Sequence, residues 1–137
     1  MTQQREIRFL NEWLRLKYPT ALIWKRVRLG PIPDKKLGNL LKITLRWADA
    51  IVYDGEKVII IESKLRPDLG AISQLKEYGR LFYETPEFEM LRDKPVELHL
   101  LLPYEWKDMV AAAQREGIIV DIFKPAWLYK EMGWKLE

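Results

Sequence analysis

The sequence predicts a mixed α/β fold in which helices flank a central sheet, with the order α-β-β-β-α-β over the first two thirds of the chain. Three observations predict it: apolar residues recur at helical spacing near the N-terminus, three short strand-like segments follow, and a second helical stripe separates these from a further apolar run. The chain has 137 residues, 48% of them hydrophobic, which is enough for one substantial core. We expect a single domain over residues 1–137.

The first elements follow from local spacing. Residues 4–17 are expected to form an amphipathic helix, because apolar side chains recur three and four residues apart until Pro19 stops the pattern. A first strand is predicted from Leu22-Ile23-Trp24 together with Val27 and Leu29. A loop over residues 30–42, rich in Pro and Gly, should connect this strand to the next.

A β-hairpin is the firmest local prediction. The segments 43–53 and 57–65 have strand character and flank Asp54-Gly55, a dipeptide that favours the tight turn between antiparallel strands. Beyond the hairpin, helical spacing and buried apolar runs alternate. The expected elements are a helix over 70–84, a strand over 96–102, a helix over 105–116, a strand over 118–123 and a short helix from Pro125. If 96–102 runs parallel to 57–65, the helix between them is a right-handed crossover.

Two acids and a lysine occupy informative positions in this hairpin. Successive strand residues point to opposite faces, so Glu62 and Lys64 share one face with the apolar Ile60. By the same alternation, Asp49 is expected on the apolar face that carries Ile51. A carboxylate on an apolar face is usually paired with a cation, hydrogen-bonded or bound to metal.

Composition restricts the chemistry. The chain has no cysteine and one histidine, His99, so thiolate sites and histidine-rich transition-metal sites are excluded. A metal would be held by oxygen, as Mg²⁺ or Mn²⁺ is, and Asp49 with Glu62 supplies a carboxylate pair to which the Ser63 carbonyl would be a natural addition. Phosphodiester hydrolysis needs an activated water and stabilised phosphoryl charge, and a metal with a nearby ammonium such as that of Lys64 provides both.

Asp49, the Glu62-x-Lys64 triplet after an apolar run and the predicted element order resemble the PD-(D/E)xK nuclease superfamily over about residues 4–102. The resemblance implies a restriction-endonuclease-like core, metal ligation by Asp49 and Glu62, and a catalytic Lys64. Gln74-x-x-x-Tyr78 resembles the QxxxY element of the RecB-like exonuclease branch and implies auxiliary roles for these two residues, which share a helical face. Departures before Asp49, where the sequence reads Arg46-Trp47-Ala48, leave the branch open.

The resemblance also implies an acid from the first helix. Glu6 and Glu12 compete for this role. At about 100° per residue, Glu6 falls near the centre of the apolar arc and Glu12 at its polar margin, so Glu6 is the expected further metal ligand.

The charge distribution indicates a polyanionic partner. Residues 1–50 carry 11 basic and 4 acidic side chains, for a net charge of +7, whereas the remainder carries 12 and 16, for −4. Basic side chains that neutralise phosphates supply most sequence-independent affinity for nucleic acid. The expected wall of a DNA groove is Lys25, Arg26, Arg28, Lys35, Lys36 and Lys42; the alternative is an ordinary solvated surface.

These observations together predict a magnesium- or manganese-dependent nuclease acting on DNA in recombination, repair or the processing of phage or mobile-element DNA. Exonuclease, stand-alone endonuclease and junction resolvase acting as a homodimer all remain open, as does RNA as substrate. The rival hypothesis is a non-catalytic nucleic-acid-binding or assembly protein on the same fold. No apolar run approaches the length of a membrane span, and no signal peptide is evident, so we expect a soluble, cytoplasmic protein.

Overall fold

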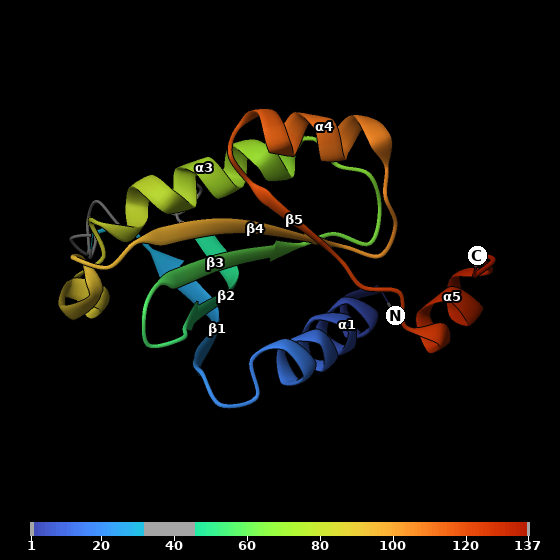
Figure 1. Ribbon diagram of the computed structural model, residues 1–137, viewed down its shortest axis with the longest axis horizontal. Helices are drawn as coiled ribbons and strands as arrows, with labels where there is room; N and C mark the ends of the chain where they lie inside the picture. The colour runs from blue at the N-terminus through green and yellow to red at the C-terminus, as the bar shows by residue number, and fades with distance from the viewer. Residues whose placement is uncertain (1, 32–45, 137) are drawn as a thin grey trace, which may run out of the picture.

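A computed structural model describes residues 2–31 and 46–136, and it contains a five-stranded sheet with helices on both faces (Figure 1). The strand order is β1-β2-β3-β4-β5; β1, β2 and β3 are antiparallel neighbours, whereas β3, β4 and β5 run parallel. The strands are β1 (Leu22–Leu29), β2 (Arg46–Tyr53), β3 (Val58–Ser63), β4 (Val96–Leu102) and β5 (Ile119–Ile122). The predicted mixed sheet and element order are therefore confirmed.

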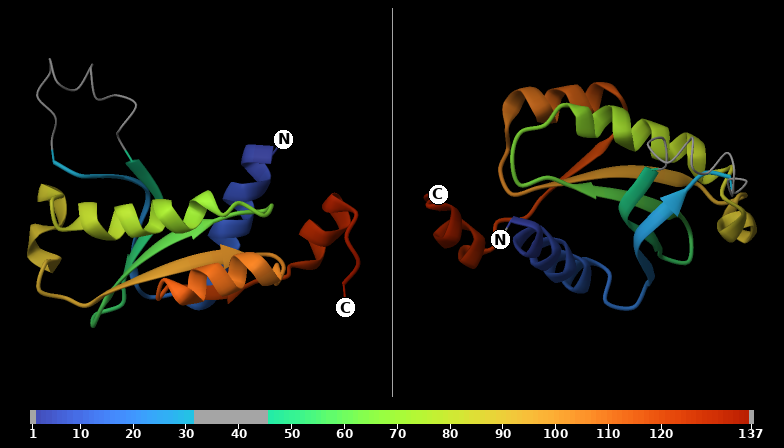
Figure 2. Two further views of the ribbon diagram at one scale, coloured as in Figure 1. Left: turned by 90° about the horizontal axis from the view of Figure 1, so that it is seen from above. Right: turned by 180° about the vertical axis from the view of Figure 1, so that it is seen from behind.

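The helices form two layers. Helices α3 and α4 connect the parallel strands and cover one face of the sheet, while α1 and α5 lie on the other (Figures 1 and 2). Their bounds, with that of a short 3₁₀ helix, are α1 (Thr2–Lys17), α3 (Gly70–Phe82), η2 (Pro86–Leu91), α4 (Lys107–Arg115) and α5 (Ala126–Met132). None of the described helices is long and apolar enough to cross a membrane.

The predicted hairpin is present between β2 and β3. Its turn is held by Asp54, whose Oδ1 accepts hydrogen bonds from the backbone N–H groups of Glu56 and Lys57, both at 2.9 Å. Gly55 has φ of 99°, a conformation that glycine adopts without strain. The turn thereby sets the register in which Ala50 lies opposite Ile61.

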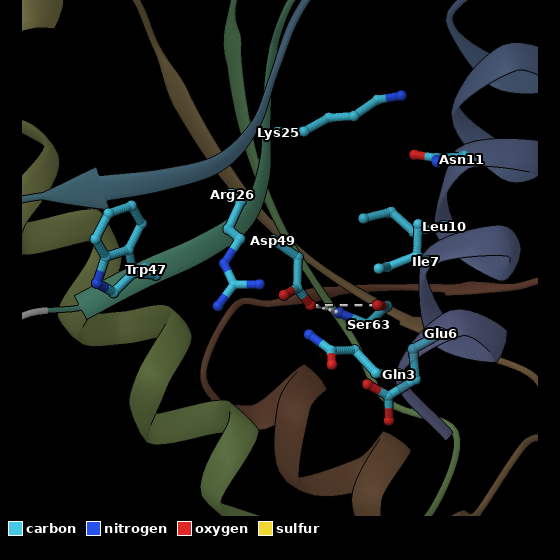
Figure 3. A pocket seen from close by; sticks show the side chains of 10 residues that line it. All are labelled: Gln3, Glu6, Ile7, Leu10, Asn11, Lys25, Arg26, Trp47, Asp49 and Ser63. Atoms are coloured by element: carbon cyan, nitrogen blue, oxygen red, sulfur yellow. Dashed lines mark hydrogen bonds between the residues drawn. The ribbon is translucent and has the colours of Figure 1, made fainter. Parts of the chain in front are cut away.

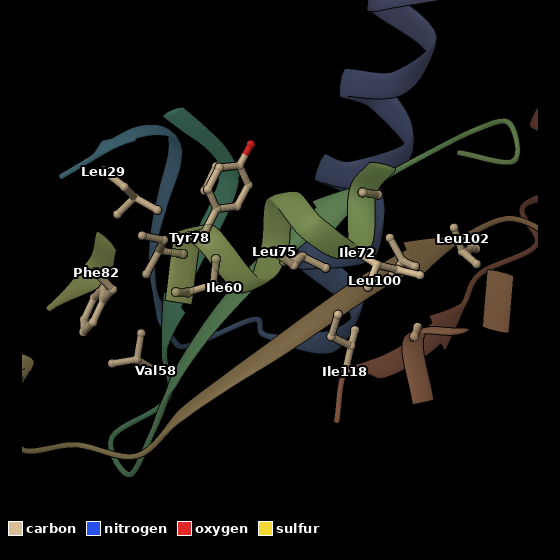
Figure 4. Close-up of a cluster of buried hydrophobic side chains, with 14 of the residues drawn as sticks. Leu29, Val58, Ile60, Ile72, Leu75, Tyr78, Phe82, Leu100, Leu102 and Ile118 are labelled. Carbon is tan, nitrogen blue, oxygen red and sulfur yellow. The ribbon is translucent and has the colours of Figure 1, made fainter. Parts of the chain in front are cut away.

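Strand β3 is the centre of the core. All six of its residues are buried, which accounts for its continuous apolar run, because a strand covered on both faces has no solvent side to make polar. Ile60 packs under α3 with Leu75 and Leu100 (Figure 4), while Ile59 and Ile61 pack under α1. The carboxyl end of β3 is consequently held rigidly by two layers of side chains.

Several boundaries differ from expectation. Strand β3 ends at Ser63, two residues before the predicted end, and α3 ends at Phe82 because the chain turns there into η2, which the sequence analysis did not include. Strand β4 has the predicted bounds. Residues 32–45, which contain most of the predicted loop and the start of the predicted second strand, lie outside the described residues.

The two ends of the described chain lie side by side. Arg5 of α1 forms an ion pair with Glu131 of α5 at 3.3 Å, and Trp127 Nε1 of α5 donates a hydrogen bond to Glu12 Oε2 of α1 at 3.0 Å. These contacts fix α5 against α1 (Figure 2). They also place both helices next to the carboxyl end of β3.

Candidate active site

The candidate active site lies where β2 and β3 come together beside α1. The register that places Ala50 opposite Ile61 brings Asp49 next to the end of β3. Ser63 donates to Asp49 Oδ2 twice, from its backbone N–H at 2.9 Å and from its hydroxyl at 3.2 Å (Figure 3). The Asp49 carboxylate is thus oriented by the neighbouring strand.

Strand alternation breaks at Asp49. Ala48 and Ile51, three residues apart, both belong to the core under α3, while Ala50 belongs to the core under α1. The expectation that Asp49 shares a face with Ile51 is wrong, because Asp49 lines a cavity together with Leu10 of α1.

The break coincides with an unusual backbone conformation in the neighbouring strand. Arg26 of β1 has φ of 53°, and the pairs Lys25 with Ala50 and Val27 with Ala48 place it opposite Asp49. A residue other than glycine with positive φ is uncommon and costs energy, and such residues concentrate at functional sites. The two paired strands change face together at this position.

Glu62 is a buried carboxyl group in an unfavourable environment. It is 5% exposed, and burial, followed by the Asp49 carboxylate alongside, raises its pKa to about 9 against a smaller opposite effect of Lys64. Within the described part of the chain, its Oε1 is buried without a hydrogen-bond partner. An acid with this surrounding retains its proton at neutral pH unless a cation stabilises the charged form.

Lys64 follows the last residue of β3 and stays attached to the sheet, because its backbone N–H donates to Leu101 O at 3.1 Å. Its Nζ lies 4.0 Å from Glu62 Oε2 and 3.4 Å from Asp68 Oδ2. The ammonium therefore lies between the buried Glu62 carboxyl group and the exposed Asp68 carboxylate. Glu62 and Lys64 are on the same side of the chain, as predicted.

A cavity of about 400 Å³ opens between α1 and the strands β1, β2 and β3 (Figure 3). Glu6 contributes to its wall together with Asp49 and Ser63, whereas Glu12 instead accepts the hydrogen bond from Trp127. Glu6 is exposed, so its expected place at the centre of the apolar arc is wrong, although it lines the same cavity as Asp49. Among the described residues, no three acidic or histidine side chains converge closely enough to hold a metal ion.

The predicted basic residues divide into three groups. Lys25 and Arg26 line the cavity. Arg28 is directed elsewhere: its guanidinium forms an ion pair with Glu87 at 3.1 Å and donates to the backbone carbonyl of Gly30 at 3.0 Å. The remaining three, which are Lys35, Lys36 and Lys42, lie outside the described residues.

Gln74 and Tyr78 occupy adjacent turns of α3. Gln74 is half-buried, and its Oε1 is the second buried acceptor without a hydrogen-bond partner in the described part of the chain. Tyr78 is buried in the core under α3, with its hydroxyl pointing away from the apolar side chains in Figure 4. The ring has a packing role, and only the hydroxyl is directed out of the core.

Three cavity residues were missed by sequence reasoning: Gln3, Asn11 and Trp47. Gln3 and Asn11 lie one turn before and one turn after Ile7, so the i, i+4, i+8 spacing was a signal that this helical stripe faces a polar space. Trp47 is half exposed in β2, an unusual environment for a large aromatic side chain.

The similarity of this chain to known proteins is detected in the fold and not in the sequence. Neither a protein-family model nor a curated protein sequence matches this chain. The fold is similar to that in the crystal structure of a repair endonuclease from Pyrococcus abyssi, with a TM-score of 0.53 and 16% sequence identity. The alignment covers 86% of this chain and 46% of that chain, so the present chain spans about half the length of the endonuclease.

At this identity the similarity shows the fold alone. The five-stranded mixed sheet and the α-β-β-β-α-β order are those of a restriction-endonuclease-like fold.

Proposed function

We propose that this chain is a divalent-metal-dependent nuclease that hydrolyses DNA phosphodiester bonds. The observation that carries the proposal is the meeting of the Asp49 and Glu62 carboxyl groups at neighbouring strands, with the Lys64 ammonium 4.0 Å from Glu62. The similarity of the fold to that of a repair endonuclease supports the same reaction class. Repair or recombination is the corresponding process.

The donor set fits a hard divalent cation. Asp49, Glu62 and the Ser63 carbonyl would hold Mg²⁺ or Mn²⁺ through oxygen, with Glu6 at the cavity wall as a further ligand. The unpartnered Oε1 of Glu62 supports this assignment, because a buried acceptor with no donor is costly and a cation would satisfy it. When bound, the metal would polarise the phosphoryl oxygen and lower the pKa of a coordinated water.

Lys64 has two roles open to it. As an ammonium it neutralises charge that develops on the phosphoryl oxygens, and through Glu62 and Asp68 it is held at the site without being buried. After losing its proton it would take one from the attacking water. Gln74 has a free acceptor oxygen with which to orient that water or the lysine, and the hydroxyl of Tyr78 is assigned the neighbouring auxiliary position.

DNA would reach the carboxylates along the basic wall. Lys25 and Arg26 stand at the cavity, where two cations can contact phosphates on either side of the scissile bond. Lys35, Lys36 and Lys42, the other basic residues predicted to contact DNA, lie outside the described residues. Arg28 would serve mainly to support the strand that carries Arg26.

The test is cleavage of end-labelled DNA in single-stranded, duplex, flap and four-way-junction form, and of matched RNA, with Mg²⁺, Mn²⁺ or chelator. Glu62→Gln removes the ligand charge with little change of shape. Glu97→Gln is the matched control, because Glu97 is another acid of the sheet whose side chain contacts His99 instead of Asp49 or Lys64.

Chelator-sensitive cutting that is lost in Glu62→Gln and kept in Glu97→Gln supports the proposal. Asp49→Asn should likewise weaken Mg²⁺ binding in a calorimetric titration. DNA binding without cutting under every condition would instead favour the non-catalytic nucleic-acid-binding protein.

A further inference from the structure

A second cavity, of about 390 Å³, lies beyond the loop that follows Lys64 and is lined mainly by aromatic side chains. Its volume is within the range of roughly 300–1,000 Å³ that is typical of small-molecule sites. Its aromatic residues are Tyr104, Trp106, Tyr129 and Trp134, and its basic residues are Arg66 and Lys135. None of the described residues that line it is acidic.

Two separate segments build this aromatic pocket. Tyr104 and Trp106 come from the connection between β4 and α4, with ring centroids 6.2 Å apart. Trp134 follows α5, where Gly133 at φ of 74° reverses the chain so that the indole packs edge-on against Tyr129 at 5.4 Å. The tertiary fold therefore gathers these rings, which no local pattern relates to one another.

The aromatic pocket is linked to the candidate active site by shared wall residues. A third cavity, of about 260 Å³, shares Glu6 with the carboxylate cavity and Leu65, Arg66 and Pro67 with the aromatic pocket, and Lys64 lies in its wall. A DNA strand whose phosphate lies at Lys64 would thus be one adjoining cavity away from the aromatic pocket.

The cations along this path differ in their availability. Lys64 forms an ion pair with Asp68. Lys124, whose Nζ lies 5.4 Å from the centroid of the Tyr104 ring, forms an ion pair with Glu105. Arg66 and Lys135 are exposed and form no ion pair with another residue in the part of the chain that the structure describes. These two side chains are available for the phosphates that flank a bound base.

We propose that the aromatic pocket binds an unpaired nucleobase of a single DNA strand next to the scissile phosphate. The inference rests on the proposed nuclease function and deepens it by naming the form of the substrate. Base stacking on aromatic rings is tolerant of sequence, and it needs a base whose face is exposed, which inside a duplex is covered by its neighbours. Tyr104 lines the pocket and is 43% exposed, so its ring is accessible to a base that enters from solvent.

The test measures binding separately from cleavage. A fluorescently labelled thymidine oligonucleotide and a duplex of the same length are titrated, in chelator, with the wild type and Tyr104→Ala. The control is Tyr83→Ala, because Tyr83 is 46% exposed and lies past the other end of α3. Loss of one stacking contact should weaken single-strand binding by about tenfold in Tyr104→Ala alone, with duplex binding unchanged.

Two further measurements locate the base. Oligonucleotides with one abasic position should show a single position at which the wild type loses affinity and Tyr104→Ala does not. Arg66→Gln with Lys135→Gln should weaken single-strand binding and reduce its salt dependence, whereas Arg115→Gln at the far end of α4 should not.

The outcomes separate this inference from the nuclease proposal. If Tyr104→Ala and Tyr83→Ala bind single strands as the wild type does while Glu62-dependent cleavage persists, the aromatic pocket is not a base site. If cleavage is absent but binding depends on Tyr104, the pocket stands and the nuclease proposal fails. Equal loss of duplex and single-strand binding in Tyr104→Ala would also overturn the pocket, since stacking would not explain it.

Discussion

Two buried ionisable side chains on neighbouring strands, Glu62 in β3 and His99 in β4, have opposite surroundings. His99 is 6% exposed and both ring nitrogens are hydrogen-bonded, Nδ1 to Asp121 at 2.7 Å and Nε2 to Glu97 at 2.9 Å. Glu62 is 5% exposed, faces the Asp49 carboxyl, and has a buried oxygen without a partner among the described residues.

These surroundings define two clusters. In the complete cluster, the hydrogen-bonding groups of His99 are paired with Asp121 and Glu97. In the incomplete cluster of Glu62, Asp49 and Lys64, one oxygen of Glu62 has no partner among the described residues. A buried charge with complementary partners on both sides is satisfied by the protein alone, whereas two adjacent carboxyl groups destabilise each other unless a proton or a cation joins them. His99 therefore needs nothing beyond the fold. The environment of Glu62 is locally unfavourable, and local incompatibility of this kind is typical of functional sites.

The largest expected effect is on the cleavage rate, and it follows from replacing Lys64, the cation of the incomplete cluster. Lys64→Ala should lower the cleavage rate by about 10²–10⁴-fold, because it removes the only ammonium recorded within 4.0 Å of Glu62 in the described structure. Melting temperature should change little, since Lys64 is partly exposed. Single-turnover kinetics and thermal unfolding measure both quantities; unchanged cleavage would remove Lys64 from the catalytic assignment.

The next largest effect is on the free energy of unfolding, and it follows from replacing the partners of His99 in the complete cluster. Asp121→Asn should lower the free energy of unfolding by about 2–3 kcal/mol, because it removes the charged partner of a buried imidazole. Glu97→Gln should cost less, since the Glu97 side chain is 34% exposed and water can replace part of its contact. Urea denaturation compares the two variants, and equal losses would contradict the dependence on burial.

The third effect has the opposite sign. Glu62→Gln should raise the free energy of unfolding of the metal-free protein at neutral pH by about 1–2 kcal/mol, because ionisation of this acid favours the unfolded chain. The same variant should not cleave DNA, so one substitution would increase stability and abolish activity. A destabilised Glu62→Gln protein in chelator would show that the carboxyl group is satisfied after all.

The smallest effect is the pH dependence of His99. Burial lowers its pKa, but the hydrogen bonds and charges of Asp121 and Glu97 outweigh this and leave the pKa above its ordinary value. The folded state then holds the proton more tightly than the unfolded state, so the stabilisation is complete below the unfolded pKa and is lost as pH rises through the folded pKa.

Glu62 contributes a slope of the same sign, because its raised pKa also makes the folded state retain a proton as pH rises. The His99 effect is therefore measured in the Glu62→Gln background, where melting temperature should still fall as pH rises above neutrality. Adding Asp121→Asn should flatten this dependence. A slope unchanged by Asp121→Asn would assign it to another group.

The sequence by itself was sufficient where the pattern is local. Strand β4 has the predicted bounds, and the hairpin turn at Asp54-Gly55 follows from residues that satisfy their own backbone. The nearness of Asp49 and Glu62 also followed from the sequence, because the turn between their strands determines which residues lie opposite one another.

Only the tertiary structure decided which way Asp49 faces. The reversal lies opposite Arg26, whose φ is 53° and which belongs to a different strand that is paired with β2 only after the sheet has formed. Two further features also depend on segments that are distant in sequence and meet only through folding. These are the unpartnered oxygen of Glu62 and the meeting of Tyr104 and Trp134 in one pocket. Alternation and helical spacing describe one segment at a time, whereas burial, pKa and cavity shape depend on segments that meet through folding.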